Sequence, residues 1–312
     1  MRRLNVWLEA SAEPIGELIS TDDEAMRFTY ALNWLVDENS HPLSLSLPLQ
    51  EDAFGDAVTR AYFNNLLQEN DQLERVMLRE GIERGDIVSL LSHVGADCSG
   101  AVSALPEDHP PIKRPGSMEH DYDALSNEDF TDLVLRLAQG RPLPDGMRDP
   151  SPVAGFRRKI SLTALPDNRF ALPKVGSGAP TTHILKIPDP EHRHEARHEE
   201  FVTDLADQVG FNVGGCVAGD VEGQEVLLIT RFDRIVTEDG IHRVHQEDFA
   251  QALGLPAELK YERRGREGRR FDAEAIGRVL AATDQPALVR EKFLEMSLFN
   301  LLIGNNDNHA KN

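Results

Sequence analysis

The last residues of the chain, Gly304-Asn-Asn-Asp-Asn-His-Ala-Lys-Asn312, form the stretch on which the fold assignment depends. They follow a segment from Ala287 to Ile303 that is apolar on most sides. Such a segment predicts a helix buried in a core. Gly304 is predicted to end this helix, because glycine readily takes the left-handed conformation found just past helix C-termini. The sequence therefore predicts a core helix that leads directly into a polar loop.

Two polar side chains of this loop have a spacing that suits phosphoryl transfer. Four residues separate Asp307 from Asn312, as in the catalytic loop of protein kinases. That reaction needs a carboxylate to orient the attacking hydroxyl and a neutral oxygen ligand to hold magnesium against the phosphates. A polar turn whose Asx side chains bond the carbonyls at the helix end explains the same residues. The spacing alone does not decide between the two.

A lysine and a glutamate upstream add a second indication. Lys186 interrupts an apolar strand predicted over Thr182–Ile187, where it is either a charge at a sheet edge or a cation held for an anionic ligand. Glu199 falls on the buried stripe of a helix predicted from 193 to 209, where an unpaired carboxylate is costly. A strand lysine paired with a helix glutamate is typical of kinases. The alternative is an amphipathic helix with a solvated first turn.

The same helix contains a motif of zinc hydrolases. His194-Glu-Ala-Arg-His198 matches H-E-x-x-H, which places two imidazoles on one helix face. Residues 191–200 are so rich in His, Glu and Arg that a chance match is easy, and no later segment offers a third ligand beyond Glu222 or Glu225. A zinc hydrolase is therefore the remote alternative.

The remaining pattern predicts an α+β protein with two domains. Prolines and a glycine in residues 141–146 place the main boundary near 140–150. The predicted strands are several in the first forty residues, then 43–49, 100–105, 159–165, 182–187 and 225–230. The predicted helices cover 52–80, 86–93, 126–137 with Ser126 as its cap, 193–209 and 287–303.

Bulk composition excludes several classes of protein. The 312 residues are 40% hydrophobic and 28% charged, as in ordinary globular proteins, and contain no run long enough to span a membrane and no secretion signal. The net charge of −20 argues against direct binding of nucleic acid. Two widely spaced cysteines, Cys98 and Cys216, suit a reducing cytoplasm. The one basic run, Lys260–Arg270, is interpreted first as a solvated loop, with a basic patch as the alternative.

Five stretches, in order along the chain, resemble the HipA family of bacterial toxin kinases. They are Pro42-Leu-Ser-Leu-Ser-Leu-Pro-Leu49, Thr181-Thr-His-Ile-Leu-Lys-Ile-Pro188, Arg231-Phe-Asp-Arg234, Gln246-Glu-Asp248 with Lys260-Tyr-Glu262, and Leu302–Asn312. The resemblance runs from end to end. It implies a two-lobed, protein-kinase-like α+β fold, with an N-terminal β-rich subdomain over 1–145 and a kinase-like core over 146–312. The nucleotide-binding lobe would span about 150–232, and a truncated helical C-terminal lobe would occupy 233–312.

The resemblance implies a serine/threonine kinase that uses ATP and Mg2+. Asp307 would be the catalytic base and Asn312 a magnesium ligand, and Lys186 would contact the ATP phosphates with Glu199 as its partner. The other nucleotide-binding residues implied by matching motifs are Ala154, Gly155, Phe156, Arg157, Arg158 and Lys159 in a phosphate-covering loop, Thr230, Arg231 and Phe232 in a hinge beside adenine, and His309 and Lys311 in the nucleotide pocket.

The resemblance also implies partners and a biological role. The protein would be a cytoplasmic toxin neutralised by a HipB-like helix-turn-helix antitoxin, and it would meet DNA only through that antitoxin. Its substrate would be a protein of the translation apparatus, such as an aminoacyl-tRNA synthetase. Glutamyl-tRNA synthetase is the family's example, and its phosphorylation stalls translation and produces dormancy.

Three departures from the family pattern bear on these expectations. Pro152 stands where the family carries a serine that phosphorylates itself, with Ser151 one place earlier. The loop at 155–159 reads Gly-Phe-Arg-Arg-Lys, where the family favours a small residue and Gln. The chain ends at Asn312, before the family's second magnesium aspartate and most of its helical lobe, and the loss of a metal-holding group should cripple transfer. Either a shortened gene product or a naturally truncated relative that binds antitoxin or nucleotide without catalysis explains this end.

Overall fold

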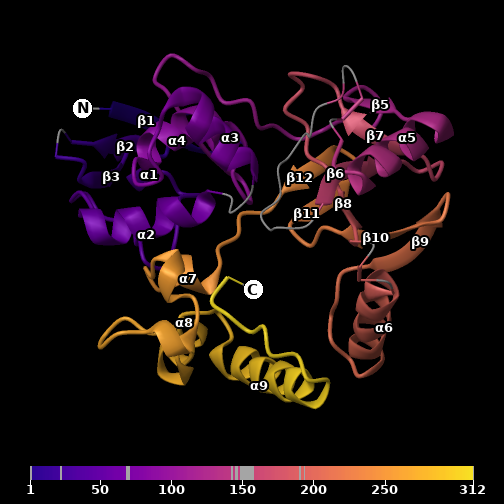
Figure 1. Cartoon of the computed structure of the whole chain (residues 1–312). Helices are drawn as coiled ribbons and strands as arrows, with labels where there is room; N and C mark the ends of the chain where they lie inside the picture. The colour runs from indigo at the N-terminus through magenta and orange to yellow at the C-terminus, as the bar shows by residue number, and fades with distance from the viewer. Residues whose placement is uncertain are drawn as a thin grey trace. The chain divides into compact units, whose positions relative to one another are not determined.

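The computed structural model describes residues 2–311 except 22, 68–70, 142, 145–146, 148–157, 190 and 193. The chain forms two compact units, and helices and strands are mixed in both (Figure 1). Unit 1 comprises residues 1–67, 72–111 and 245–312, and unit 2 comprises residues 68–71 and 112–244. Among the helices described, none has the length and hydropathy needed to cross a bilayer.

The sheet of unit 1 is antiparallel, with the strand order β3-β2-β1-β4. Its strands are β1 (Arg2–Leu8), β2 (Gly16–Ser20), β3 (Met26–Tyr30) and β4 (Val102–Leu105). Alternate residues of β1 are buried, as the apolar alternation near the N-terminus predicts. The strand predicted over 100–105 is present as β4.

Short helices pack beside this sheet and complete the larger core of unit 1. They are α1 (Leu32–Leu35), α2 (Asp56–Leu66), α3 (Asp71–Glu80), α4 (Ile87–Val94) and the 3-10 turn η1 (Gly95–Asp97). Phe28 is fully buried at the centre, where its ring lies 4.9 to 6.2 Å from the rings of Tyr30, Phe54 and Phe63. The single helix predicted over 52–80 is wrong, because Leu67 is extended and ends α2 before α3 begins.

The strand predicted over 43–49 is also wrong. Residues 44–47 form a tight turn in which the Leu47 N–H donates to the Ser44 carbonyl at 3.0 Å. The Tyr30 hydroxyl holds the turn, because it donates to the Leu47 carbonyl at 2.5 Å and accepts from the Leu43 N–H at 2.7 Å. Leu43 and Leu47 are buried while Leu45 is 44% exposed. The leucines therefore alternate around a turn and not along a strand.

The rest of unit 1 is helical and ends in the polar loop. It contains α7 (Phe249–Ala252), η2 (Ala257–Leu259), η3 (Glu262–Arg264), α8 (Ala273–Ala281) and α9 (Pro286–Leu302). The prediction that α9 is a core helix is wrong, because none of its residues is buried and Leu301 and Leu302 are 76% and 84% exposed. Helix α8 packs against it. Periodicity shows which side chains are apolar but not what lies against them.

Unit 2 is built on a six-stranded sheet with the order β5-β7-β6-β8-β10-β9. The strands are β5 (Tyr122–Ala124), β6 (Arg158–Ala164), β7 (Phe170–Pro173), β8 (His183–Ile187), β9 (Cys216–Val221) and β10 (Gln224–Thr230), and a hairpin of β11 (Arg234–Thr237) and β12 (Gly240–Arg243) follows. The strands predicted at 159–165, 182–187 and 225–230 are present as β6, β8 and β10. Sequence analysis missed β5, β7, β9 and the hairpin of β11 and β12.

The two helices of unit 2 accompany this sheet. Helix α5 (Asn127–Ala138) begins where predicted, since the Ser126 hydroxyl accepts from the Asp129 N–H at 3.0 Å. Its buried Leu133 packs in one core with Ile160 of β6 and Leu185 of β8. Helix α6 (Glu195–Gln208) contacts β9 and β10 and corresponds to the helix predicted over 193–209.

A buried charge cluster follows β10 in unit 2. Asp233 accepts from Arg231 at 2.8 and 3.0 Å and from Arg234 at 2.7 Å, and all three side chains are less than 10% exposed. Burial alone would raise the pKa of Asp233, but the two guanidinium groups outweigh it and hold the pKa below its usual value. The carboxylate is therefore charged in the folded protein.

Replacement of Asp233 by Asn should leave two buried guanidinium groups without their counter-ion. We expect the free energy of unfolding to fall by about 3–5 kcal/mol in urea denaturation at neutral pH. Because the folded pKa is lowered, this contribution is complete above the ordinary value of 3.8 and is lost as pH falls through the folded pKa. The difference between wild type and variant should therefore vanish in strong acid.

Asp167→Asn is the matched control. It removes a carboxylate from the Arg169 pair, whose side chains are 51% and 55% exposed, so it should change stability little. Equal losses in both variants would contradict the structural role of Asp233.

Candidate functional site

Lys186 and Glu199 form an ion pair in unit 2. Lys186 Nζ lies 2.6 Å from Glu199 Oε1, which joins β8 to α6. Strand β8 is bonded to β6 on one side and β10 on the other, so the interpretation of Lys186 as a charge at a sheet edge is wrong. The two side chains are 29% and 38% exposed, so a ligand in solvent can reach them. The kinase-like pairing expected from the sequence is present.

A second lysine faces the same side of the sheet. The antiparallel register of β6 and β8 places Lys159 directly opposite Lys186. Directly opposite residues of an antiparallel pair point to one face, and like charges there repel each other. Two ammonium groups on one face can both contact an anion. The donor set therefore fits the phosphates of a nucleotide.

The structure does not bring Arg158 together with these lysines. Its place in the β6 register is opposite Ile187, on the face that packs with α5. Its guanidinium donates to the Ala138 carbonyl and lies 3.8 Å from Asp189. The other predicted members of the phosphate-covering loop, Ala154, Gly155, Phe156 and Arg157, lie outside the described residues, as does Asn312.

The predicted hinge residues follow one another at the end of β10. The Thr230 hydroxyl lies 3.2 Å from His183 Nε2, and burial lowers the pKa of that histidine. Arg231 is held in the buried cluster with Asp233, which fixes the backbone of the segment. Phe232 is 80% exposed beside it. An exposed aromatic ring on a fixed backbone suits contact with a planar base.

Unit 1 carries the polar loop, which begins at Gly304 as predicted. Gly304 has a φ of +73°, and its N–H donates to the Leu301 carbonyl while the Asn305 N–H donates to the Asn300 carbonyl at 2.8 Å. These two bonds are the Schellman arrangement that closes a helix C-terminus. The direction in which the loop leaves α9 is therefore set by backbone geometry.

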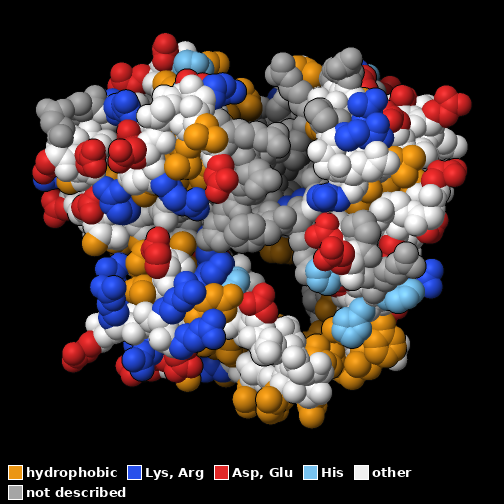
Figure 2. Space-filling model, viewed as in Figure 1, with side chains coloured by type: hydrophobic (Ala, Val, Ile, Leu, Met, Phe, Trp, Pro, Cys, Tyr) orange, Lys and Arg blue, Asp and Glu red, His pale blue; other side chains and the backbone are white. Residues whose placement is uncertain are grey.

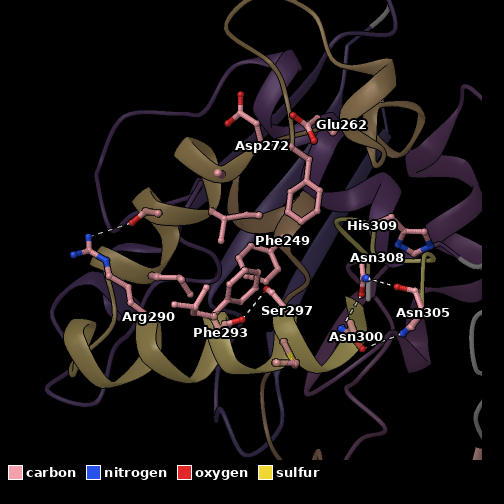
Figure 3. Close-up of a pocket in the computed structure, with 17 residues that line it drawn as sticks. Phe249, Glu262, Asp272, Arg290, Phe293, Ser297, Asn300, Asn305, Asn308 and His309 are labelled. Atoms are coloured by element: carbon pink, nitrogen blue, oxygen red, sulfur yellow. Dashed lines mark hydrogen bonds between the residues drawn. The ribbon is translucent and has the colours of Figure 1, made fainter. Parts of the chain in front are cut away.

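Two asparagines of the loop bond to each other and to Asn300 near the end of α9, as Figure 3 shows. Asn300 donates to the Asn308 side chain at 3.0 Å, Asn305 donates to the Asn300 side chain at 3.2 Å, and Asn308 donates to the Asn305 carbonyl at 3.0 Å. A polar turn is therefore present, but among the described residues the carbonyls at the helix end accept from the Gly304 and Asn305 N–H groups and not from Asx side chains. Asp307 contributes its backbone N–H, which donates to Asn305 Oδ1 at 3.2 Å, and its side chain is exposed.

Tyr261 is the residue that sequence reasoning missed. Its hydroxyl donates to Asp307 Oδ1 at 3.2 Å, and its ring meets the His309 ring edge to face at 5.2 Å. The neighbouring Lys260 carbonyl accepts from the Ala310 N–H at 2.9 Å. The stretch Lys260-Tyr-Glu262 was noted only for its family resemblance, and no local periodicity predicts a contact across 46 residues.

The loop is also bonded to α7. The Ala250 N–H donates to the Ala310 carbonyl at 2.9 Å. Asp248 begins α7 with a capping box, in which its side chain and that of Gln251 each accept from the other's backbone N–H. Burial raises the pKa of Asp248 although the Gln251 N–H and the nearby Lys311 and His309 oppose the shift.

The turn at 43–47 joins the same assembly. The Leu45 N–H donates to Glu247 Oε1 at 3.0 Å, and the Ser46 hydroxyl donates to the Gln251 carbonyl at 2.7 Å. Burial raises the pKa of Glu247. Three of the five stretches that carry the family resemblance therefore meet in unit 1.

A cavity of about 880 Å³ lies beside the polar loop in unit 1 (Figure 3). Phe249, Phe271 and Phe293 line it from α7, the segment before α8, and α9, with Asn305 and Asn308 also in the lining. Its side chains are mainly apolar, with the amides of the loop at one end.

The zinc interpretation finds no support. His194 precedes α6 with a φ of +70° and His198 lies in its first turns, both exposed. Among the residues that the structure describes, no three His, Cys, Asp or Glu side chains gather as metal ligands.

The predicted site residues are divided between the two units. Lys159, Lys186, Glu199 and residues 230–232 belong to unit 2, and Asp307, His309 and Lys311 belong to unit 1. Their convergence on one nucleotide stays a prediction.

Two family models match this chain. The HipA N-terminal domain matches residues 4–105, and the HipA-like C-terminal domain matches residues 151–312. The chain belongs to the HipA family. The division at 145/146 predicted from the sequence stays a prediction.

Individual HipA-family relatives agree with this assignment. The chain is 35% identical to "Putative kinase Y4mE" of Sinorhizobium fredii over all of its own length and 73% of that protein. It is 29% identical to "Serine/threonine-protein kinase toxin HipA" of Shewanella oneidensis over 96% of its length and 68% of that protein.

A solved HipA structure shares the fold. The HipA chain of the Shewanella oneidensis complex of HipA, HipB and operator DNA has a TM-score of 0.77 and 26% identity, over 99% of this chain and 71% of that one. The α+β, kinase-like fold class predicted from the sequence is confirmed.

Asp248→Ala should loosen the polar loop through α7. Loss of the capping box is expected to cost about 1–2 kcal/mol. The Ala250 N–H donates to the Ala310 carbonyl, so hydrogen exchange of the Ala250 amide should be about five- to thirtyfold faster in this variant. Asp272→Ala is the control: it removes the equivalent cap of α8, where Asp272 accepts from the Ala275 N–H at 2.9 Å. Equal acceleration at Ala250 in both variants would show that α7 does not hold the loop.

Proposed function

We propose that this HipA-family chain is a serine/threonine protein kinase toxin that transfers the γ-phosphoryl group of ATP to a protein. The observation that carries the proposal is the Lys186–Glu199 pair on an interior strand, with Lys159 on the same face. A surface ion pair as exposed as this adds little to stability. The placement of the pair is therefore better explained if Glu199 holds the Lys186 ammonium group for the ATP phosphates than if the pair stabilises the fold.

The proposed chemistry assigns one task to each group. The substrate hydroxyl gives its proton to the Asp307 carboxylate as its oxygen attacks the γ-phosphorus. The bond from that phosphorus to the oxygen bridging the β-phosphate breaks, and ADP leaves with the electron pair. The Tyr261 hydroxyl, 3.2 Å from Oδ1, orients the carboxylate, and Lys186 holds the phosphates. Magnesium, when bound, neutralises charge on the phosphates, with Asn312 as a proposed ligand.

The remaining predicted residues complete the proposed nucleotide site. Residues 154–159 would cover the phosphates, Thr230, Arg231 and Phe232 would lie beside the adenine, and His309 and Lys311 would line the pocket. The geometry favours Lys159 over Arg158 in this role, because Lys159 shares a face with Lys186.

The proposed partners follow from the family and the charge. A HipB-like helix-turn-helix antitoxin would neutralise the toxin in the cytoplasm. In support of such a partner, the Shewanella structure contains HipA, HipB and operator DNA. A net charge of −20 suits contact with DNA through such an antitoxin and not directly. The proposed substrate is a protein of translation such as glutamyl-tRNA synthetase, whose modification would produce persistence.

A second candidate is a HipA relative that binds antitoxin or nucleotide without transferring phosphate. The exposed apolar side chains of α9, the helix that leads into the polar loop, favour it. Nucleotide binding without any transfer would support this candidate and overturn the first.

Asp307→Asn should abolish transfer and leave ATP binding intact. Loss of a general base lowers turnover by about 10²- to 10⁴-fold, whereas the amide keeps the size of the side chain. Transfer of labelled phosphate measures the first property and calorimetric titration with ATP the second. Asp284→Asn, at an exposed position of unit 1, should retain both. Undiminished transfer by the Asp307 variant would refute its assignment as the base.

Lys186→Ala should weaken nucleotide binding. Loss of a charged donor to a phosphate costs about 1.5–3 kcal/mol, so the Kd for ATP should rise roughly ten- to hundredfold. Lys174→Ala is the control in the same unit, since its Nζ donates to the His120 carbonyl at an exposed position. An unchanged Kd in the Lys186 variant would remove this lysine from the site.

A further inference from the structure

The segment from Lys260 to Arg270 is strongly basic in an acidic protein. It holds six Lys or Arg residues and two Glu, although the net charge of the chain is −20. Figure 2 shows Lys and Arg side chains gathered over the part of unit 1 that contains α7 and α8. The exposed arginines of the segment are Arg263, Arg264, Arg266, Arg269 and Arg270.

The five arginines are distinguished by their density, since all of them lie between residues 263 and 270. Across the described ranges of the chain, none of the five forms an ion pair. By contrast, Arg278 of α8 pairs with Glu274 at 3.1 Å, and Arg60 of α2 pairs with Asp56 at 3.0 Å. In a chain with 53 acidic and 33 basic residues, five neighbouring guanidinium groups without acidic partners indicate a surface kept free for an anionic ligand.

Two of the arginines lie next to the candidate catalytic group. The Arg263 and Arg264 guanidinium carbons are 5.1 and 5.6 Å from the centre of the Tyr261 ring. The hydroxyl of the same ring donates to Asp307 at 3.2 Å. Cations over an aromatic ring are favourably held there. The Tyr261 side chain therefore contacts both the arginines of the basic segment and the polar loop.

These distances match the reach of a short peptide. An extended chain advances about 3.3 Å per residue. A substrate whose hydroxyl lies at Asp307 thus brings residues two to four places away over the Tyr261 ring. A carboxylate at such a place would meet Arg263 or Arg264.

The charge of the whole chain favours a short acidic segment of protein over nucleic acid. A long polyanion such as nucleic acid is disfavoured by the net charge of −20 of the whole chain. An acidic segment of a few residues contacts only the positive charge of these arginines. Exposed arginines attract such a segment effectively.

We propose that Arg263 and Arg264 form a docking site that directs phosphoryl transfer to hydroxyls flanked by Asp or Glu two to four residues away. This docking site rests on the proposed kinase function and names the substrate class for it.

The test uses three serine peptides that differ only at the flanking positions, with Asp and Glu, with Asn and Gln, or with Lys. Phosphate transfer by the whole chain should show a kcat/KM about tenfold higher for the acidic than for the amide peptide, as expected for two exposed ion pairs. The double variant R263E/R264E should lose this ratio or reverse it. R263Q/R264Q removes the charges without reversal and should bring the ratio close to one. R278E, at an arginine outside the segment, should retain the wild-type ratio.

A binding measurement separates this proposal from the proposed function. The acidic peptide with Ala in place of Ser, labelled for fluorescence anisotropy, should bind wild type more tightly than R263E/R264E, and salt should weaken the binding. If wild type transfers phosphate to no peptide but this difference remains, the kinase function fails and the acidic docking surface stands. Transfer with equal kcat/KM to acidic and amide peptides overturns the docking site and leaves the kinase in place. Binding of transfer RNA that the double variant loses, without binding of the acidic peptide, assigns the segment to nucleic acid and also overturns the proposal.

Discussion

The position of the candidate catalytic loop depends on the backbone of Ala310. This residue is fully buried, its N–H donates to the Lys260 carbonyl and its carbonyl accepts from the Ala250 N–H. Buried backbone groups must find partners, so these two bonds fix the loop against α7 and against the segment that carries Tyr261. A larger side chain at 310 would have to displace that packing. Asp307, three residues earlier, is exposed and belongs to the loop that these bonds anchor.

The charged groups of the chain fall into two kinds that burial distinguishes. The Arg231–Asp233–Arg234 cluster is almost fully buried. Its ion pairs are therefore required for stability, because a buried charge without a counter-ion is costly. The Lys186–Glu199 pair is about one-third exposed and contributes little to folding. Lys186 lies on an interior strand and its ammonium group is held by Glu199 of α6. Binding of a ligand therefore explains this pair better than a contribution to stability does. The two clusters lie in one unit, and the first fixes the backbone of the segment that follows β10.

Sequence patterns predicted those features whose causes are local. The Ser126 cap and the Gly304 terminus follow from the preferences of single residues, and both are present. Strands β6, β8 and β10 were predicted because each is a short segment rich in apolar and β-branched residues. The Lys186–Glu199 pairing was predicted because a helix stripe and a strand lysine both required a partner.

The features that were missed have causes far away in the sequence. The leucines at 43–49 alternate as in a strand, but the Tyr30 hydroxyl and the Gln251 carbonyl bend them into a turn. Tyr261 meets Asp307 across 46 residues, and no periodicity reports such a contact. The exposure of α9 was missed for the same reason, since an apolar pattern identifies side chains that favour burial without naming what covers them.

The two interpretations of the polar loop that the sequence left open are complementary. Asn300, Asn305 and Asn308 bond to one another, and the Asn305 side chain accepts from the Asp307 N–H, which is an Asx turn. That network uses the amides and the Asp307 N–H, and it leaves the Asp307 carboxylate on the exposed side, where Tyr261 contacts it. The asparagines hold the turn, and the Asp307 side chain is exposed beside them.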